Sequence, residues 1–201
     1  MAPAETSEER ADTRTRILDV ADRLFRHYGY AKTTVADLAR ELGMSPANVY
    51  RFFTSKLEIV EAIASRMLDR RHAHNLAIVA SGGSATDRLL RFFVDNHRMN
   101  VEVFASDPRA YEIVEVAMVE QWPTIADHLV QMTDVIETLI REGVAAGEFP
   151  SRGDLRRLAA CTRQAFVSLF HPTLLLQCSD DPERAGPEEL ADFVLRAIRC
   201  P

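Results

Sequence analysis

Polar side chains of the types that contact nucleic acids gather in residues 33–56, which read TTVADLARELGMSPANVYRFFTSK. Asn48 and Arg51 belong to the residue types that bind the edge of adenine or guanine through paired hydrogen bonds. Other hydroxyl and ammonium groups suit phosphate oxygens, contacts that fix the register of a protein on DNA and make its affinity salt dependent. These groups belong to Thr33, Thr34, Tyr50 and Lys56. The stretch therefore has the side chains for DNA binding, provided that the fold presents them together.

Two short helices joined by a tight turn are predicted to present these side chains. Thr34 can cap the first helix, and Gly43 interrupts it. The apolar face of this helix consists of Val35, Leu38, Ala39 and Leu42. Ser45-Pro46 then begins a second helix, whose N-terminal N–H groups suit phosphate. This pattern is typical of a helix-turn-helix motif, although an ordinary small helical bundle has the same caps and glycine turns.

Helical periodicity continues through the rest of the chain. Apolar residues recur three and four positions apart, and no stretch alternates apolar and polar residues as a strand does. Besides the two short helices, the predicted segments are about 17–28, a longer helix with apolar residues over 57–68 before a break at 81–84, and 87–105, 108–120, 123–143, 154–177 and 187–199. Pro172 is expected to kink or break the 154–177 segment, because proline lacks the backbone donor. The predicted fold class is therefore all-α, with about nine helices.

Charge is divided unevenly along the 201 residues. The net charge is −6, but the first 56 residues carry +1 and the remainder −7, so the acidic average does not exclude a DNA partner. Arg10, Arg14 and Arg16 precede or open the first helix and are interpreted as a solvated helix start; the alternative is an arm that reaches phosphates.

Several other classes of protein are disfavoured by the sequence. No apolar run is long enough to cross a bilayer, and residues 1–11 lack the apolar core of a signal peptide, so we expect a cytoplasmic protein without membrane contact. The three cysteines form no closely spaced pair, and the histidines have no metal-ligand spacing. No catalytic constellation is recognisable. We therefore expect neither a cofactor, nor a metal, nor enzymatic activity.

A ligand pocket is predicted between the middle helices, because residues 92–132 are rich in aromatic, histidine and methionine side chains. The predicted ligand-binding residues are Phe93, His97, Phe104, Tyr111, Met118, Trp122, His128 and Met132. The alternative for each of them is an ordinary core position. The acidic residues of the same region, Glu102, Glu112, Glu115 and Glu120, are interpreted as a solvated face.

Residues 14–60 resemble the N-terminal DNA-binding domain of the tetracycline-repressor (TetR) family of bacterial regulators. The resemblance rests on an ordered set: Ile17, Ala21, Phe25, Gly29, Thr33, Thr34, Val35, Ala39, Gly43, Ser45, Tyr50, Phe53, Lys56 and Leu57. It implies a three-helix DNA-binding domain followed by a divergent helical domain that binds a small ligand and forms a homodimer. The positions that match DNA-facing ones in the family are Thr33, Thr34, Ser45, Ala47, Asn48, Tyr50, Arg51 and Lys56.

The expected domains are a flexible segment 1–11, a helix-turn-helix domain 12–58 and a ligand-binding and dimerisation domain 59–201. The resemblance implies dimerisation through the last two helices, where candidate interface residues are Phe166, Leu169, Phe170, Leu190, Phe193 and Val194; the alternative is that they complete the monomer core. The predicted function is a repressor that a small, largely apolar ligand releases from a palindromic operator. The alternatives are an activator, or a helical small-molecule-binding protein or enzyme that no longer binds DNA.

Overall fold

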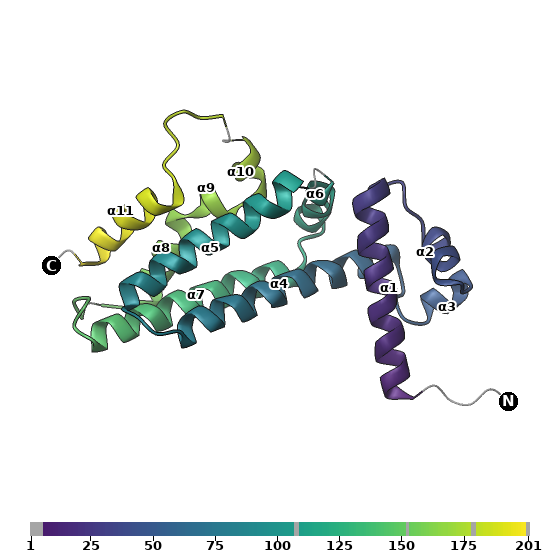
Figure 1. Ribbon diagram of the computed structural model, residues 1–201, viewed down its shortest axis with the longest axis horizontal. Coiled ribbons are helices and arrows are strands. Elements are labelled where there is room, and N and C mark those ends of the chain that lie inside the picture. The colour runs from purple at the N-terminus through teal and green to yellow at the C-terminus, as the bar shows by residue number, and fades with distance from the viewer. Residues whose placement is uncertain (1–5, 107–108, 152, 178–179, 200–201) are drawn as a thin grey trace. The chain divides into compact units, whose positions relative to one another are not determined.

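The computed structural model describes residues 6–106, 109–151, 153–177 and 180–199 (Figure 1). Over these ranges the regular structure consists of eleven helices and no strand. The helices are α1 (Ser7–Tyr28), α2 (Val35–Leu42), α3 (Pro46–Tyr50), α4 (Lys56–Ala80), α5 (Ala85–Ser106), α6 (Ala110–Glu120), α7 (Pro123–Ala145), α8 (Leu155–Ala165), α9 (Val167–Phe170), α10 (Pro172–Gln177) and α11 (Pro187–Arg199). The predicted all-α class is therefore confirmed.

The chain forms two compact units, which we describe separately. The first unit contains residues 1–67 and 107–122, so α6 belongs with the N-terminal helices. The second contains residues 68–106 and 123–201. Helix α4 contributes residues to both units and continues without a break through positions 58 and 59, where the sequence had suggested a domain boundary.

The helices of the first unit begin and end where side-chain chemistry allows. Thr6 and Glu9 form a reciprocal capping box, so α1 begins at Ser7, inside the segment expected to be flexible. The buried face of α1 packs against α2, and its inward side chains include Leu18 and Phe25. Gly43 ends α2 in the left-handed conformation (φ 68°, ψ 29°), which glycine adopts at little steric cost.

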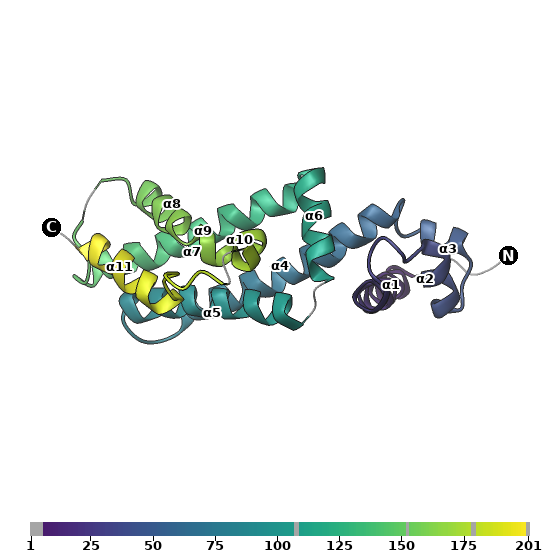
Figure 2. The same ribbon diagram turned by 90° about the horizontal axis from the view of Figure 1, so that it is seen from above.

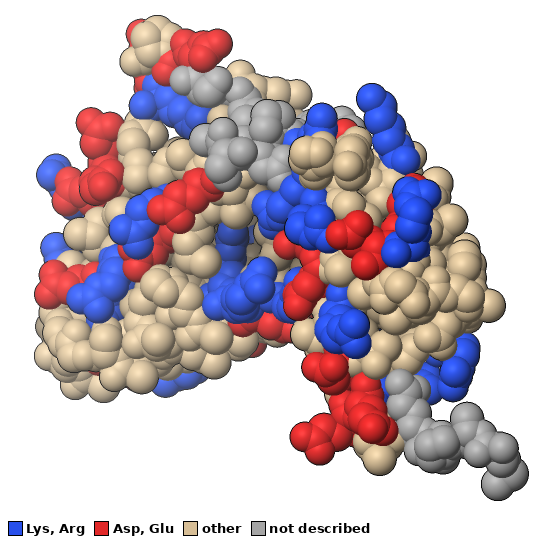
Figure 3. All heavy atoms as spheres, turned by 45° about the vertical axis from the view of Figure 1, so that its right-hand side comes forward, with Lys and Arg blue, Asp and Glu red and all other residues tan. Residues whose placement is uncertain are grey.

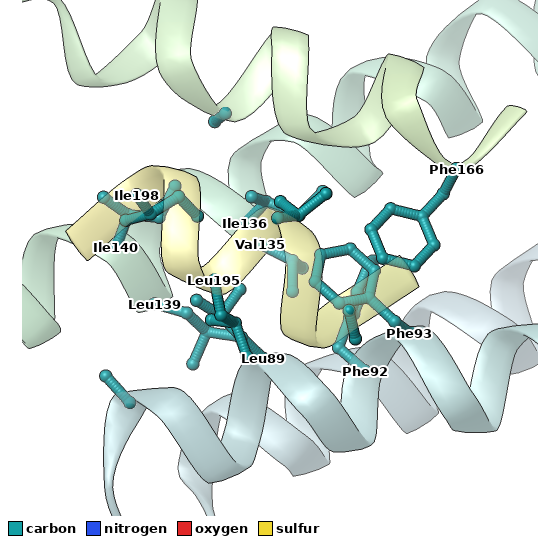
Figure 4. Close-up of a cluster of buried hydrophobic side chains, with 14 of the residues drawn as sticks. Leu89, Phe92, Phe93, Val135, Ile136, Leu139, Ile140, Phe166, Leu195 and Ile198 are labelled. Carbon is teal, nitrogen blue, oxygen red and sulfur yellow. The ribbon is translucent and has the colours of Figure 1, made fainter. Parts of the chain in front are cut away.

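The second unit is built around the aromatic and aliphatic core drawn in Figure 4. Helix α7 packs against α5 and α8, and α5 also packs against α11 (Figure 2). The rings of Phe93 and Phe166 are stacked with centroids 3.8 Å apart and planes 4° from parallel. Phe92 and Phe170 extend this cluster. Burial of such large side chains is the main favourable term in folding a helical bundle.

The segment expected as one helix over 154–177 is three helices, which accounts for the difference between nine and eleven. Proline lacks a backbone donor and disfavours the helical conformation of the residue before it. His171, which precedes Pro172, is accordingly extended (φ −76°, ψ 122°), and α10 begins at the proline. A second interruption falls at Phe166, the residue whose ring stacks on Phe93.

The surface carries charges of both signs. On the face drawn in Figure 3, Lys and Arg side chains are interspersed with Asp and Glu. Within the described ranges, no helix combines the length and apolar character that crossing a membrane requires.

Candidate nucleic-acid interface

Helices α2 and α3 form a helix-turn-helix whose two N-termini are closed by side chains. The Thr34 hydroxyl accepts a hydrogen bond from the Asp37 N–H (3.2 Å), and the Asp37 carboxylate accepts one from the Thr34 N–H (2.9 Å). The Thr34 hydroxyl also donates to the Asp37 carboxylate at 2.6 Å, and this bond together with the one from the Thr34 N–H lowers the pKa of Asp37. At the start of α3, the Ser45 hydroxyl accepts from the Asn48 N–H at 3.2 Å. The two hydroxyls predicted to face DNA thus also define where the helices begin.

Helix α3 keeps its apolar side chains inside and its polar ones outside. Val49 is fully buried, whereas Ser45, Ala47 and Arg51 are exposed, and Tyr50 is 49% exposed. The Arg51 guanidinium donates to the Asn48 side-chain oxygen at 3.3 Å, so the two groups suited to base edges lie together. Five of the predicted DNA-binding positions therefore share one short helix and its cap.

Thr33 has a different role from the one predicted. Its side chain is only 2% exposed, and its hydroxyl donates to the Gly29 carbonyl at 2.8 Å. A buried hydroxyl bonded to a carbonyl stabilises the turn after α1 and is not placed to meet a phosphate. The sequence could not show this, since a threonine before a helix cap is equally compatible with exposure.

Lys56, the first residue of α4, connects that helix by hydrogen bonds to the turn that follows α1. Its ammonium group donates to the carbonyls of Tyr30 (2.6 Å) and Thr33 (2.9 Å) and lies 4.0 Å from the centroid of the Tyr30 ring. Burial lowers the pKa of Lys56, an effect that the Glu112 carboxylate opposes. Two of its three protons are thus used within the protein, which leaves one for an outside acceptor.

Two arginines of α1 also pack against the phenylalanines that follow α3. The Arg10 guanidinium lies over the Phe52 ring at 5.2 Å and donates to the Arg51 carbonyl at 3.1 Å. The Arg14 guanidinium lies over the Phe53 ring at 4.5 Å. These side chains brace the helix-turn-helix, a role that neither a solvated helix start nor a DNA-reaching arm describes.

The position of Glu112 differs from the one expected from the sequence. It was expected on a solvated face, but its carboxylate accepts a hydrogen bond from the Tyr30 N–H at 2.9 Å. A Cβ atom built on Gly29 would lie 3.1 Å from the same carboxylate, so the approach is close. Helix α6 is thereby tied to the turn that follows α1, within the unit that carries the helix-turn-helix.

Comparison with known families bears on both parts of the chain. Residues 17–63 match the family described as bacterial regulatory proteins, tetR family. Residues 85–191, more than half of the chain, match the family described as tetracyclin repressor-like, C-terminal domain. The chain belongs to the TetR family. That family consists of transcriptional regulators and not of enzymes, so the expectation of a helix-turn-helix regulator is confirmed.

Individual relatives agree with this assignment. The HTH-type transcriptional repressor KstR2 of Rhodococcus jostii is 36% identical over 80 residues, which are 40% of this chain and 39% of KstR2. SrpR of Pseudomonas putida is 28% identical over 176 residues, 84% of this chain and 78% of SrpR. A crystal structure of a TetR/AcrR-family regulator from Thermobifida fusca has a TM-score of 0.62 at 25% identity, covering 94% of this chain and 97% of that one. The chain spans between about a third and two fifths of the length of several curated relatives that it matches, among them KstR2 of Rhodococcus jostii.

The predicted ligand-binding residues of this TetR-family chain are not all brought together. Phe93, His97, His128 and Met132 lie in the second unit, whereas Trp122 is buried in the first. Phe93 and Met132 are core residues, as the alternative held. Of the others, the side chains of Phe104, Tyr111 and Met118 lie outside the described part of the structure.

The candidate dimer residues differ in how much of each side chain is exposed. Phe166, Leu169 and Val194 are buried in the subunit's own core, so they complete the monomer and do not offer a surface. Phe170 and Leu190 are half-buried against that core. Phe193, by contrast, is 69% exposed on α11.

Four polar residues of the second unit were not predicted from the sequence: Arg71, which is half-buried, and the buried Asn75, Asn96 and Asn100. Arg71 and Asn75 occupy α4 at positions where the four-residue spacing from Ile63 and Met67 predicts an inward face. Asn96 and Asn100 similarly follow Phe92 on α5, and both are at most 2% exposed. Polar residues at apolar-stripe positions are the signal that could have identified them.

Proposed function

We propose that this protein is a repressor that binds a palindromic DNA operator as a homodimer and leaves it when a small-molecule effector binds. The observation that carries the DNA-binding part is the outward polar surface of α3 and its cap, which lies within a matched TetR-family helix-turn-helix. The relative KstR2 is itself named a repressor, which supports repression over activation.

The residues proposed to contact DNA fall into two groups. Asn48 and Arg51 suit base edges, since an amide can pair with adenine and a guanidinium with guanine. The remaining positions suit backbone phosphates or close approach of the helix to the groove; they are Thr34, Ser45, Ala47, Tyr50 and Lys56. Thr33 is removed from the set because its hydroxyl is buried and already bonded.

The homodimer is proposed to form through the exposed face of α11, with Phe193 as its apolar centre. Phe193 is 69% exposed to water. Packing its ring against Phe193 of a two-fold related copy would remove this apolar surface from water, which is favourable. A two-fold dimer would hold two α3 helices about 34–36 Å apart, the distance between successive major grooves on one side of DNA.

The effector is proposed to bind in the second unit, where His97 bonds to the carbonyl of the core residue Leu169 at 3.2 Å and His128 is buried, so that both add polar groups near an apolar core. A small and largely apolar molecule fits such surroundings. Its binding would favour a conformation with a lower affinity for DNA, and the shift can be no larger than the difference in its affinity for the two conformations.

Fluorescence anisotropy with labelled DNA tests the first part of this proposal. The probe is the region upstream of the protein's own gene, compared with random DNA of equal length at the same salt concentration. We expect tighter binding to the upstream DNA, a loss of that preference in Arg51→Ala, and unchanged binding in the control Arg70→Gln, whose side chain is exposed on α4 in the second unit. Equal affinity for both DNAs would reject the repressor, and a fall in target expression on gene deletion would indicate an activator.

A further inference from the structure

Three side chains that can carry positive charge lie within electrostatic range of a buried histidine in the second unit. His128 of α7 is 9% exposed, and Arg71 and His72 of α4 and Arg163 of α8 all lie near enough to repel its protonated form. Burial and this repulsion lower the pKa of His128 to about 4, so the imidazole is neutral at pH 7. Burial likewise lowers the pKa of Arg71 to about 10.

The hydrogen-bond partners of these cations are neutral. The Arg71 guanidinium donates to the Asn100 side-chain oxygen at 2.5 Å. The Arg163 Nε donates to the Thr133 hydroxyl at 3.0 Å. In the part of the chain that the structure describes, neither arginine forms a salt bridge, and the Asp95 carboxylate on α5 is paired with His74 and Arg98.

Buried polar atoms without partners occur at His128 and on α4 and α5, the helices that carry Arg71 and Asn100. The Nδ1 atom of His128, the side-chain nitrogen of Asn75 and the side-chain oxygen of Asn96 are buried and, over the described residues, make no hydrogen bond. A buried cation without a counter-charge and a buried polar atom without a partner both oppose folding. At His128 an unpartnered buried nitrogen coincides with nearby arginines that have no carboxylate partner among the described residues, which indicates a group that enters from outside and supplies negative charge.

We propose that the effector carries a carboxylate and that Arg71, together with His128 and Arg163, binds it. This inference rests on the proposed function and specifies the chemistry of its effector. A carboxylate matches the planar guanidinium of Arg71 through two parallel hydrogen bonds, and it accepts a third from a neutral histidine N–H. Asn100, which accepts from Arg71, also donates to the Phe170 carbonyl at 2.9 Å. The Phe170 ring in turn stacks on Phe93, so apolar side chains lie next to this hydrogen-bonded group and the body of the acid is apolar.

Matched sets of small molecules separate the carboxylate from the apolar body. The probes are octanoate, octan-1-ol and octylamine, and phenylacetate, 2-phenylethanol and 2-phenylethylamine, with phenyl phosphate as a second anion. The full-length protein is heated with each at millimolar concentration in a buffer free of carboxylates. We expect at least one acid to raise Tm by about 5 °C at saturation, and its alcohol and amine to change Tm little.

Two variants test whether the arginines are responsible. Arg71→Met keeps the length of the side chain and removes its charge, so the acid should no longer raise Tm. The buried Asn100 oxygen loses its donor in this variant, so the effect of the acid is measured against the variant's own Tm without ligand. Arg163→Met, which should weaken acid binding by about 10-fold, is measured as well in case Arg71→Met does not fold. Arg70→Gln is the control, one position earlier on α4 and exposed, and should respond as the wild type does.

Several outcomes would overturn the carboxylate site: no acid exceeding its alcohol, a larger shift with phenyl phosphate or an amine, or an unchanged acid response in both methionine variants. DNA anisotropy distinguishes this from failure of the proposed function. An acid that raises Tm through Arg71 without weakening DNA binding supports the site and rejects effector-controlled release. If only an alcohol or an amine weakens DNA binding, effector-controlled release from DNA is supported and the carboxylate site is rejected.

Discussion

The buried His128 makes the stability of this TetR-family protein depend on pH in a calculable way. Its pKa is about 4 in the folded protein, against about 6.5 for an exposed histidine. The unfolded chain therefore binds a proton at a higher pH than the folded one. The sign follows directly: the contribution is fully present above pH 6.5, is lost progressively as the pH falls, and is gone below about pH 4.

The size of the effect follows from the two pKa values. Linkage gives a loss of about 2 kcal/mol in the free energy of unfolding between pH 7 and pH 5, and about 3 kcal/mol in full. His128→Gln removes the titrating group and keeps a polar side chain of similar reach. The difference in unfolding free energy between pH 7 and pH 5 should therefore be about 2 kcal/mol smaller in the variant than in the wild type.

Urea denaturation, followed by far-UV circular dichroism, measures this difference. The protein concentration is fixed, because the stability of a dimer depends on it, and the buffers contain no carboxylate. The control is His27→Gln, at an exposed position of α1, which should keep the wild-type pH dependence. An equal pH dependence in wild type and His128→Gln would refute the reasoning, since it would mean that His128 titrates alike in the folded and unfolded states.

Three further predictions concern stability around the two units. Gly143→Ala should lower the free energy of unfolding by about 1–3 kcal/mol in urea denaturation, because the added Cβ would lie 2.3 Å from the buried Phe149 ring. Glu112→Ala should lower it by about 1 kcal/mol, because the Tyr30 N–H loses its charged acceptor. Thr34→Ala should cost about 1 kcal/mol through loss of the α2 cap, and circular dichroism melting should show a lower Tm.

Matched variants at or near these positions serve as controls. Gly82→Ala has open space around the new methyl group and should be neutral or slightly stabilising. Glu112→Gln keeps an acceptor oxygen and should lose less stability than the alanine variant. Thr34→Ser keeps the capping hydroxyl and should melt close to the wild type. A control as unstable as its test variant would contradict the mechanism assigned to that position.

Local chemistry predicted most helix boundaries correctly. Thr34, Ser45 and Asp154 cap the helices that follow them, and Pro172 begins a new helix. Each of these effects acts within three or four residues, a distance over which the chain's own sequence supplies both partners. The early start of α1 at Ser7 came from the same chemistry, since Thr6 and Glu9 have the spacing of a capping box.

Long-range contacts were beyond such reasoning. The bond between Glu112 and the Tyr30 N–H joins residues 82 positions apart, and nothing in the local pattern of either distinguishes it from a solvated contact. Phe166 and Val194 had the composition of an interface as much as of a core, and only packing placed them inside. A helix at a dimer interface and a helix in a monomer core have the same apolar periodicity, so periodicity cannot distinguish the two positions.

The sequence by itself determined that this chain is an all-α helix-turn-helix regulator, because caps, turns and an ordered set of motif residues act locally and recur within the family. The tertiary structure decided which of those side chains are free to act. It buried the Thr33 hydroxyl and brought Arg71 and Arg163 from two other helices near enough to His128 to help lower its pKa. The physical reason is that burial and the sum of nearby charges depend on segments distant in sequence, and these two quantities set both exposure and pKa.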